Sequence, residues 1–183
     1  MTTKVKATID DLYKVPGNTK AEIVDGEIRL MSPTGSKPGR ASLTIASSLR
    51  RHEKPNYPGY AFGDNVGFVV NLPDRDSFSP DAAWYIGNID SMKFLQGAPV
   101  FAAEVRSEND YGPVAERERA KKRADYFLAG ALVVWDVDLL SPDVVKSYRA
   151  SDPDNPTIYR SDDRAAAEPA VPGWSMAVDD LFD

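Results

Sequence analysis

PVFAAEV (Pro99–Val105) and ALVVWDV (Ala131–Val137) are two apolar runs with the length of a buried strand. Between them, a helical pattern extends from about Val114 to Ala129, with Pro113 suited to the first helical position and Gly130 to the C-terminal stop. A strand, a helix and a second strand in this order predict a parallel crossover. We therefore expect an α/β fold built on a mixed sheet.

The flanking sequence predicts a β-hairpin, a second long helix and several shorter strands. Lys20–Met31 places an Asp-Gly pair between two strand-like runs, which is the strongest short-range signal of a hairpin. Leu43, Ala46 and Leu49 recur at helical spacing and predict a helix that ends near His52. That helix is expected over residues 41–52. Further strands are expected at residues 66–70, 81–86, 143–148 and 157–160, and a final helical turn at 178–182.

Length and composition indicate one soluble domain. The 183 residues are 42% hydrophobic and 27% charged, and no apolar run approaches the roughly 20 residues that span a bilayer. The absence of cysteine excludes disulfides and thiolate metal sites and fits a cytoplasmic protein, and the N-terminus lacks the apolar region of a secretory signal. Within the single domain, 1–183, we expect an N-terminal extension (1–19) and an acidic segment (151–183) that packs on the core.

The charge distribution bears on nucleic-acid binding. The net charge is -6, and the segment from Ser151 onward carries all of it, with eight acidic and two basic residues. The remainder is balanced, with 20 residues of each sign. Because phosphate neutralisation requires clustered Lys and Arg, tight non-specific binding to duplex DNA is not expected.

Two carboxylates stand beside apolar strands. Asp81 precedes one such run and Glu104 lies near the end of another, 23 residues later. Acids at the ends of adjacent strands can converge on one hard cation, and Mg²⁺ usually takes one or two protein carboxylates with water and substrate phosphate as its other ligands. Such an ion could activate water against a phosphodiester, and a nearby lysine would orient that water or stabilise the developing charge.

The same residues resemble a known family. Pro80-Asp81 followed by Glu104-x-Arg106 resembles the PD-(D/E)XK nuclease superfamily, with arginine in place of the motif's lysine. A longer series is similar to the Uma-two family of bacterial restriction-endonuclease-like proteins and extends from Glu22 to Phe182. The series comprises EIVDGEI (Glu22–Ile28), MSPTG (Met31–Gly35), Pro80-Asp81, EVRS (Glu104–Ser107), Lys122-x3-Tyr126-x3-Gly130-x4-Trp135 and VPGW (Val171–Trp174).

The resemblance implies a fold, a site and a reaction. The fold would be a restriction-endonuclease-like core flanked by helices, with an additional N-terminal β-hairpin. The implied active site comprises Glu22, Asp81, Glu104 and Lys122. Asp81 and Glu104 would bind Mg²⁺, with Mn²⁺ as a substitute and the Val105 carbonyl as a third ligand, and Glu22 would take a second metal or a metal-bound water. The implied reaction is hydrolysis of DNA, and a homodimer would suit cleavage of both strands.

Two departures from the family pattern concern residues near this site. Arg106 occupies the usual lysine position, and since it is too basic to accept a proton it could only supply positive charge. Pro38 stands where relatives often carry a histidine. His52, the only histidine, is interpreted as a surface residue.

The identity of the helical lysine stays open between two neighbours. A stripe of Ala120, Ala124, Phe127 and Leu128 brings Lys121 closer to the core, whereas Tyr126 and Gly130 bring Lys122 closer. Lys122 is preferred for its spacing to Tyr126, Gly130 and Trp135. The basic residues 117–123 are interpreted as a mainly solvated face that is also the best candidate for a phosphate contact.

Ordinary structural roles compete with each catalytic role. Asp81 could bind backbone donors after a proline, Glu22 could pair across the hairpin with Arg29, and Lys122 could form a surface ion pair with Glu118. For the whole chain, the main alternative is a non-catalytic module that retains the fold and binds nucleic acid or protein. Glycoside cleavage by a pair of acids is a third and weaker alternative.

Overall fold

The computed structural model describes residues 5–55 and 57–183; Met1 to Lys4, which begin the predicted extension, and Asn56 lie outside the described residues. Its centre is a six-stranded mixed sheet with the order β11-β10-β9-β8-β6-β3. The strands are β3 (Tyr60–Phe62), β6 (Ala82–Tyr85), β8 (Phe101–Val105), β9 (Val133–Val137), β10 (Val145–Arg149) and β11 (Asp152–Tyr159). The predicted mixed α and β fold is therefore confirmed.

The crossover that decides the fold is present. Strands β8 and β9 pair in parallel from Phe101 opposite Val133 to Val105 opposite Val137. Helix α3 (Pro113–Leu128) connects them, with Pro113 at its first position and Gly130 beyond its end at φ 103°. Every other neighbouring pair in the large sheet is antiparallel.

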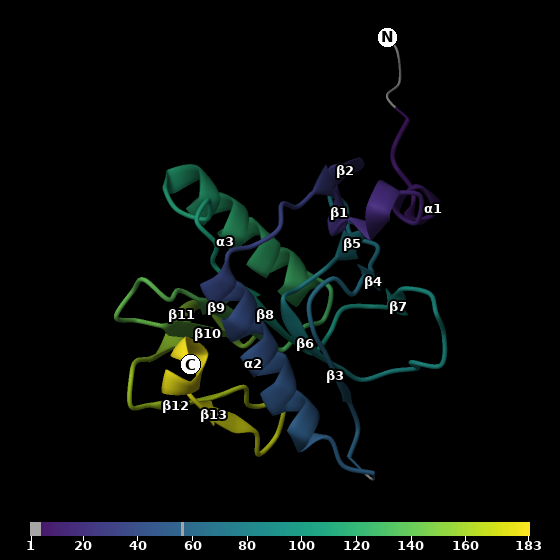
Figure 1. Ribbon diagram of the computed structural model, residues 1–183. Helices are drawn as coiled ribbons and strands as arrows, with labels where there is room; N and C mark the ends of the chain where they lie inside the picture. The colour runs from purple at the N-terminus through teal and green to yellow at the C-terminus, as the bar shows by residue number, and fades with distance from the viewer. Residues whose placement is uncertain (1–4, 56) are drawn as a thin grey trace.

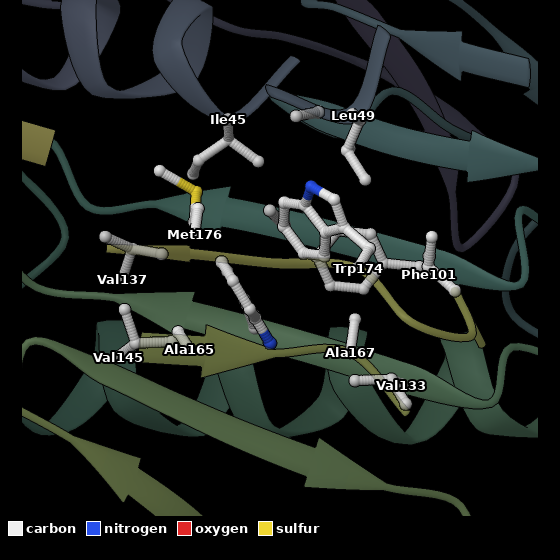
Figure 2. Packing of buried hydrophobic residues seen from close by; sticks show 14 of the residues in the cluster. Ile45, Leu49, Phe101, Val133, Val137, Val145, Ala165, Ala167, Trp174 and Met176 are labelled. Carbon is white, nitrogen blue, oxygen red and sulfur yellow. The ribbon is translucent and has the colours of Figure 1, made fainter. Parts of the chain in front are cut away.

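Helix α2 (Ser36–His52) covers one face of the large sheet (Figure 1). Alternate residues of the strands, including Trp84, Phe101 and Trp135, point to that face and are fully buried. Figure 2 shows Trp174 from the C-terminal segment lying among Leu49 of α2 and the strand residues; its ring centroid lies 5.2 Å from that of Trp135. The three tryptophans, Trp84, Trp135 and Trp174, are therefore core residues.

The opposite face carries α3 and contains both apolar and charged residues. Ala102, Val134 and Tyr126 pack there with Phe78, whose ring stacks on Tyr126 at a centroid distance of 4.0 Å. Glu104 and Asp136 are opposite each other on β8 and β9, and their side chains make their contacts with α3 on this same face. Glu104 and Asp136 thus bring charge into the layer between α3 and the sheet towards the ends of β8 and β9.

The predicted hairpin is formed by β1 (Ala21–Val24) and β2 (Glu27–Leu30), which pair antiparallel. Asp25 and Gly26 have φ of 54° and 73°, as a tight primed turn requires. The hairpin lies beside β5 (Ser77–Phe78), because the Ile23 amide donates to the Ser77 hydroxyl and the Ser79 amide donates to Glu22.

Smaller elements complete the structure. Two further sheets have the orders β5-β4-β7 and β12-β13. Their strands are β4 (Phe68–Val69), β5 (Ser77–Phe78), β7 (Leu95–Gln96), β12 (Arg164–Ala166) and β13 (Ser175–Ala177); the short helices are α1 (Ile9–Leu12), η1 (Pro16–Asn18) and η2 (Asp179–Phe182). No described helix has the length and hydropathy needed to cross a membrane.

Three predicted boundaries were wrong. The strand predicted at residues 157–160 is the end of β11, which begins at Asp152. Helix α2 begins at Ser36 and not at residue 41, because Pro38 lies in its first turn, where a missing N–H costs no helical hydrogen bond. The strand predicted at residues 66–70 is reduced to Phe68–Val69, since Gly67 packs against the Phe94 ring and Val70 turns into the following loop.

Candidate active site

Asp81 and Glu104 meet at one end of the sheet. Because β6 and β8 are antiparallel, the residue before β6 lies beside the end of β8. The Asp81 amide donates to the Ala103 carbonyl at 3.1 Å, and the Ser42 hydroxyl of α2 donates to the Asp81 carbonyl at 2.8 Å. The backbone of Asp81 is therefore fixed by both β8 and α2, and its side chain opens into a groove of about 830 Å³.

Val105 presents its backbone to the Asp81 side chain. Its amide donates to Oδ2 of Asp81 at 2.8 Å. The amide and carbonyl of a strand residue point to the same side, so the Val105 carbonyl also faces towards Asp81. Oδ2 of Asp81 thus has the alternative role of binding a backbone donor. The other oxygen, Oδ1, can contact a cation.

Lys122 of α3 reaches the two glutamates. Its Nζ lies 2.8 Å from Oε1 of Glu104 and 2.9 Å from Oε1 of Glu22. Lys121 points elsewhere, to Asp25 at 3.3 Å, and its side chain is 49% exposed. The stripe that favoured Lys121 was wrong because Leu128, one of its members, is exposed.

Tyr126 orients Glu104 from the next turn of α3. It is the buried residue of this helix, and its hydroxyl donates to Oε1 of Glu104 at 2.7 Å. Both contacts of the Glu104 carboxylate with α3 therefore fall on Oε1. Oε2 is the oxygen left to face an added ligand.

The Glu22 carboxylate contacts Arg75, the Ser79 amide and Lys122. Its Oε2 accepts from Arg75 at 2.6 Å, and its Oε1 accepts from the Ser79 amide at 2.8 Å as well as facing Lys122. The pairing with Arg29 across the hairpin was wrong, because Arg29 bonds to Asp25 at 2.8 Å, although Glu22 and Arg29 are opposite each other in register.

Arg75, which sequence reasoning missed, anchors this part of the site. Its side chain is 5% exposed and bonds to Asp125 of α3 at 2.9 Å in addition to Glu22. It therefore ties α3 to the hairpin. Its position in a polar loop gave no sign that it would be buried.

Lys20 was also missed, and it contacts Asp81 directly. Its Nζ lies 2.6 Å from Oδ1 of Asp81 and 2.6 Å from Oδ1 of Asp64, and its side chain is 16% exposed. The available signal was its place immediately before the strand that carries Glu22. We call Lys20, Glu22, Asp81, Glu104 and Lys122 the lysine cluster.

Charges within the lysine cluster shift the pKa values of its members. Burial and the nearby Glu104 carboxylate raise the pKa of Asp81 above its usual range, against the opposing effect of Lys20. Burial also acts to raise the pKa of Glu104, but Lys122 and Lys20 outweigh it and lower the pKa. Burial acts to lower the pKa of Lys122, but Glu104 and Glu22 raise it further, so this amine stays protonated.

A second charged group lies beside the first, between α3 and the sheet. The Arg106 guanidinium bonds to Asp136 at 2.7 and 2.9 Å and to Glu116 of α3. Arg119 donates to Asp136 at 2.6 Å. We call Arg106, Glu116, Arg119 and Asp136 the arginine cluster. The interpretation of residues 117–123 as a mainly solvated face was wrong for Arg119 and Lys122.

The oxygen atoms near Asp81 can be compared with the ligands that a hard divalent cation needs. Among the described residues, no three His, Cys, Asp or Glu side chains gather as a ready-made metal site. Mg²⁺ does not require such a cage, since it binds through one or two carboxylates and keeps several waters. Asp81, Glu104 and the Val105 carbonyl therefore fit this ion chemically.

The groove is mixed in charge. It is lined by eight carboxylates and six cationic side chains, which leaves a formal charge of -2. The cations are Lys20, Arg29, Arg75, Arg119, Lys121 and Lys122. A polyanion entering this groove would meet repulsion unless added cations reversed its sign.

Comparison with known proteins places the chain in a family. A family model described as "Putative restriction endonuclease", Uma2, matches residues 9–179. The chain belongs to the Uma2 family. No match was found among curated proteins.

A solved structure shares the Uma2 fold. It is the crystal structure of a putative nuclease belonging to DUF820 from Anabaena variabilis ATCC 29413. The two chains are 18% identical, 96% of this chain and 97% of the other are covered, and the TM-score is 0.73. At this identity the likeness shows the fold. The description of the Uma2 family supports a restriction-endonuclease-like nuclease.

Proposed function

We propose that this chain is a divalent-metal-dependent endonuclease that hydrolyses DNA phosphodiester bonds. One observation carries the proposal: Asp81 and Glu104 meet at one end of the sheet, with the Lys122 amine 2.8 Å from Glu104, inside a groove. Strand-end carboxylates with a lysine beside them suit phosphoryl chemistry in a member of this family.

Each residue has a distinct proposed task. Asp81 and Glu104 would hold Mg²⁺, or Mn²⁺ in its place, with the Val105 carbonyl as a further ligand. When bound, the ion would supply Lewis-acid activation of the phosphoryl group and of water. Lys122, kept protonated by two carboxylates, would stabilise the negative charge that accumulates on the phosphate oxygens.

Glu22 would act mainly by placing Lys122. The Arg75 guanidinium bonds to Oε2 of Glu22, and the Ser79 amide bonds to Oε1, the oxygen that also faces Lys122, so the amine has one defined position. A role of Glu22 towards a second metal or a metal-bound water would require it to exchange one of these contacts.

The mixed charge of the groove favours weak, metal-assisted association with DNA over tight non-specific binding. Counter-ion release from phosphates drives binding only where cationic side chains cluster. A cytoplasmic homodimer would bring two such grooves to the two strands of a duplex, and this assembly belongs to the same proposal.

Cleavage of a supercoiled plasmid and of labelled oligonucleotides tests the function. The wild-type protein should cut in Mg²⁺ or Mn²⁺ and should be inactive in excess chelator. Asp81→Asn and Glu104→Gln should each reduce cutting to the level of the buffer. No cutting by the wild-type protein, together with unchanged DNA or protein binding in both variants, would instead support the non-catalytic alternative, which the acidic groove favours.

A further inference from the structure

Lys20 occupies the free oxygen of a proposed metal ligand. Oδ2 of Asp81 is taken by the Val105 amide, and Oδ1 lies 2.6 Å from the Lys20 amine. The amine therefore stands where a cation shared with Glu104 would approach Asp81. A lysine amine is charged at neutral pH.

The Lys20 amine already has a second anionic partner, Asp64. Oδ1 of Asp64 lies 2.6 Å from the same amine and also accepts from the Asn65 amide at 2.8 Å. The Asn65 side chain in turn donates to the Asn18 carbonyl at 3.1 Å, which fixes the loop against the segment that carries Lys20. Asp64 is thus a built anchor for the amine and not a chance surface neighbour.

We infer that Lys20 is a resident counter-ion that competes with the divalent cation for Asp81, and that when the cation binds it gives up its contact with Asp81 and keeps its contact with Asp64. The inference rests on the proposed function, since it concerns the same carboxylates. Two cations near one carboxylate oxygen repel each other strongly in a partly buried site, so metal binding must break the contact between Lys20 and Asp81. Asp64 lowers the cost because the amine keeps one partner.

Two opposite effects on metal affinity follow. Lys20→Met removes the competitor, so the protein should bind Mn²⁺ about tenfold more tightly. Asp64→Asn leaves the displaced amine without its anchor, so binding should weaken about tenfold. In the double variant, Asp64→Asn should lose most of its effect, because the residue through which it acts is gone.

The experiment is titration of Mn²⁺ into the full chain, followed by electron paramagnetic resonance of the free ion, without DNA. Lys121→Met is the matched control: it removes a charge from the same groove, but Lys121 contacts Asp25 and not Asp81, so the affinity should change less than threefold. Thermal unfolding followed by circular dichroism checks that each variant is folded. Because the Asp64 side chain is 48% exposed, Asp64→Asn should disturb the fold little.

The outcomes separate this inference from the proposed function. Equal or weaker Mn²⁺ binding by folded Lys20→Met, or the same loss from Asp64→Asn with and without Lys20, would overturn the role of Lys20 while leaving the metal site intact. No Mn²⁺ binding by any form, wild type included, would overturn both. Tighter binding by Lys20→Met, weaker binding by Asp64→Asn and coupling between them would support the inference.

Discussion

The lysine cluster and the arginine cluster lie side by side beneath α3, on the neighbouring strands β8 and β9. Glu104 and Asp136 are opposite each other on β8 and β9, so the two clusters differ little in backbone setting. They differ in their cations. Lysine is a compact point charge on a flexible stem, whereas the arginine guanidinium forms two parallel bonds in a fixed plane.

Access to the groove separates them further. The members of the lysine cluster all line the groove, whereas only Arg119 does so in the arginine cluster. Arg106 and Arg119 both bond to Asp136. By contrast, Oδ1 of Asp81 faces Lys20, and Oε2 of Glu104 faces the groove. The difference indicates that one cluster can exchange its cations for a ligand while the other holds α3 on the sheet.

The largest effect is expected from Lys122, the proposed catalytic lysine of the lysine cluster. Lys122→Met should reduce DNA cleavage by about 10²–10³-fold, because it removes a charge positioned for the transition state. Lys121→Met should stay within about threefold of wild type, since Lys121 points to Asp25. Rates of plasmid nicking at saturating Mg²⁺ check the pair, and equal losses in both variants would mean that the groove needs charge but no particular lysine.

The next largest effect is expected on the stability of the fold, from a change in the arginine cluster. Asp136→Asn leaves the buried Arg106 with only one of its two close carboxylates and removes the charge opposite Arg119. Breaking a buried pair from one side costs about 3–5 kcal/mol. Urea denaturation monitored by circular dichroism measures the change, and a loss below about 1 kcal/mol would contradict a structural role for this cluster.

The pH dependence of stability should also reflect the structural role of the arginine cluster. Burial acts to raise the pKa of Asp136, but Arg106 and Arg119 outweigh it and hold the pKa below its ordinary value. A depressed carboxyl pKa stabilises the fold above the unfolded pKa, and the gain is lost as pH falls through the folded pKa.

Wild-type protein should accordingly lose stability steeply below about pH 4, where unfolded aspartate begins to take up protons. Asp136→Asn should show a shallower loss over the same range. Free energies of unfolding from urea titrations at a series of pH values compare them, and parallel curves would place the acid sensitivity in other carboxylates.

The smallest effect is expected from an ion pair outside both clusters. Asp143 pairs with Arg160 at 2.8 Å, but the arginine side chain is 60% exposed. Exposed pairs contribute about 0–1 kcal/mol, so Asp143→Asn should barely change the urea midpoint. A cost similar to that of Asp136→Asn would remove the distinction between buried and exposed pairs on which the comparison depends.

The sequence predicted the elements whose signals are local. The Asp-Gly turn at Asp25, the apolar runs of β8 and β9 and the Pro113 start of α3 each depend on neighbouring residues, and all were found. The two-residue strands β5 and β7 were not predicted, because they exist only through pairing with β4.

The site divided in the same way. Asp81 and Glu104 could be brought together from strand order, and Lys122 from its spacing to Tyr126. Lys20 and Arg75 could not, since each is recruited by tertiary contacts, with residues 61 and 53 positions away. The closed pairing of Arg106 was hidden for the same reason, because Asp136 lies on the neighbouring strand.

The central claim, that the lysine cluster binds a functional cation while the arginine cluster is structural, is tested most directly by one matched pair. Glu104→Gln and Asp136→Asn make the same change on opposite residues of β8 and β9. In a Mn²⁺ titration followed by electron paramagnetic resonance, folded Glu104→Gln should lose binding and Asp136→Asn should retain it at temperatures where it is folded. Wild-type affinity in Glu104→Gln would contradict the account.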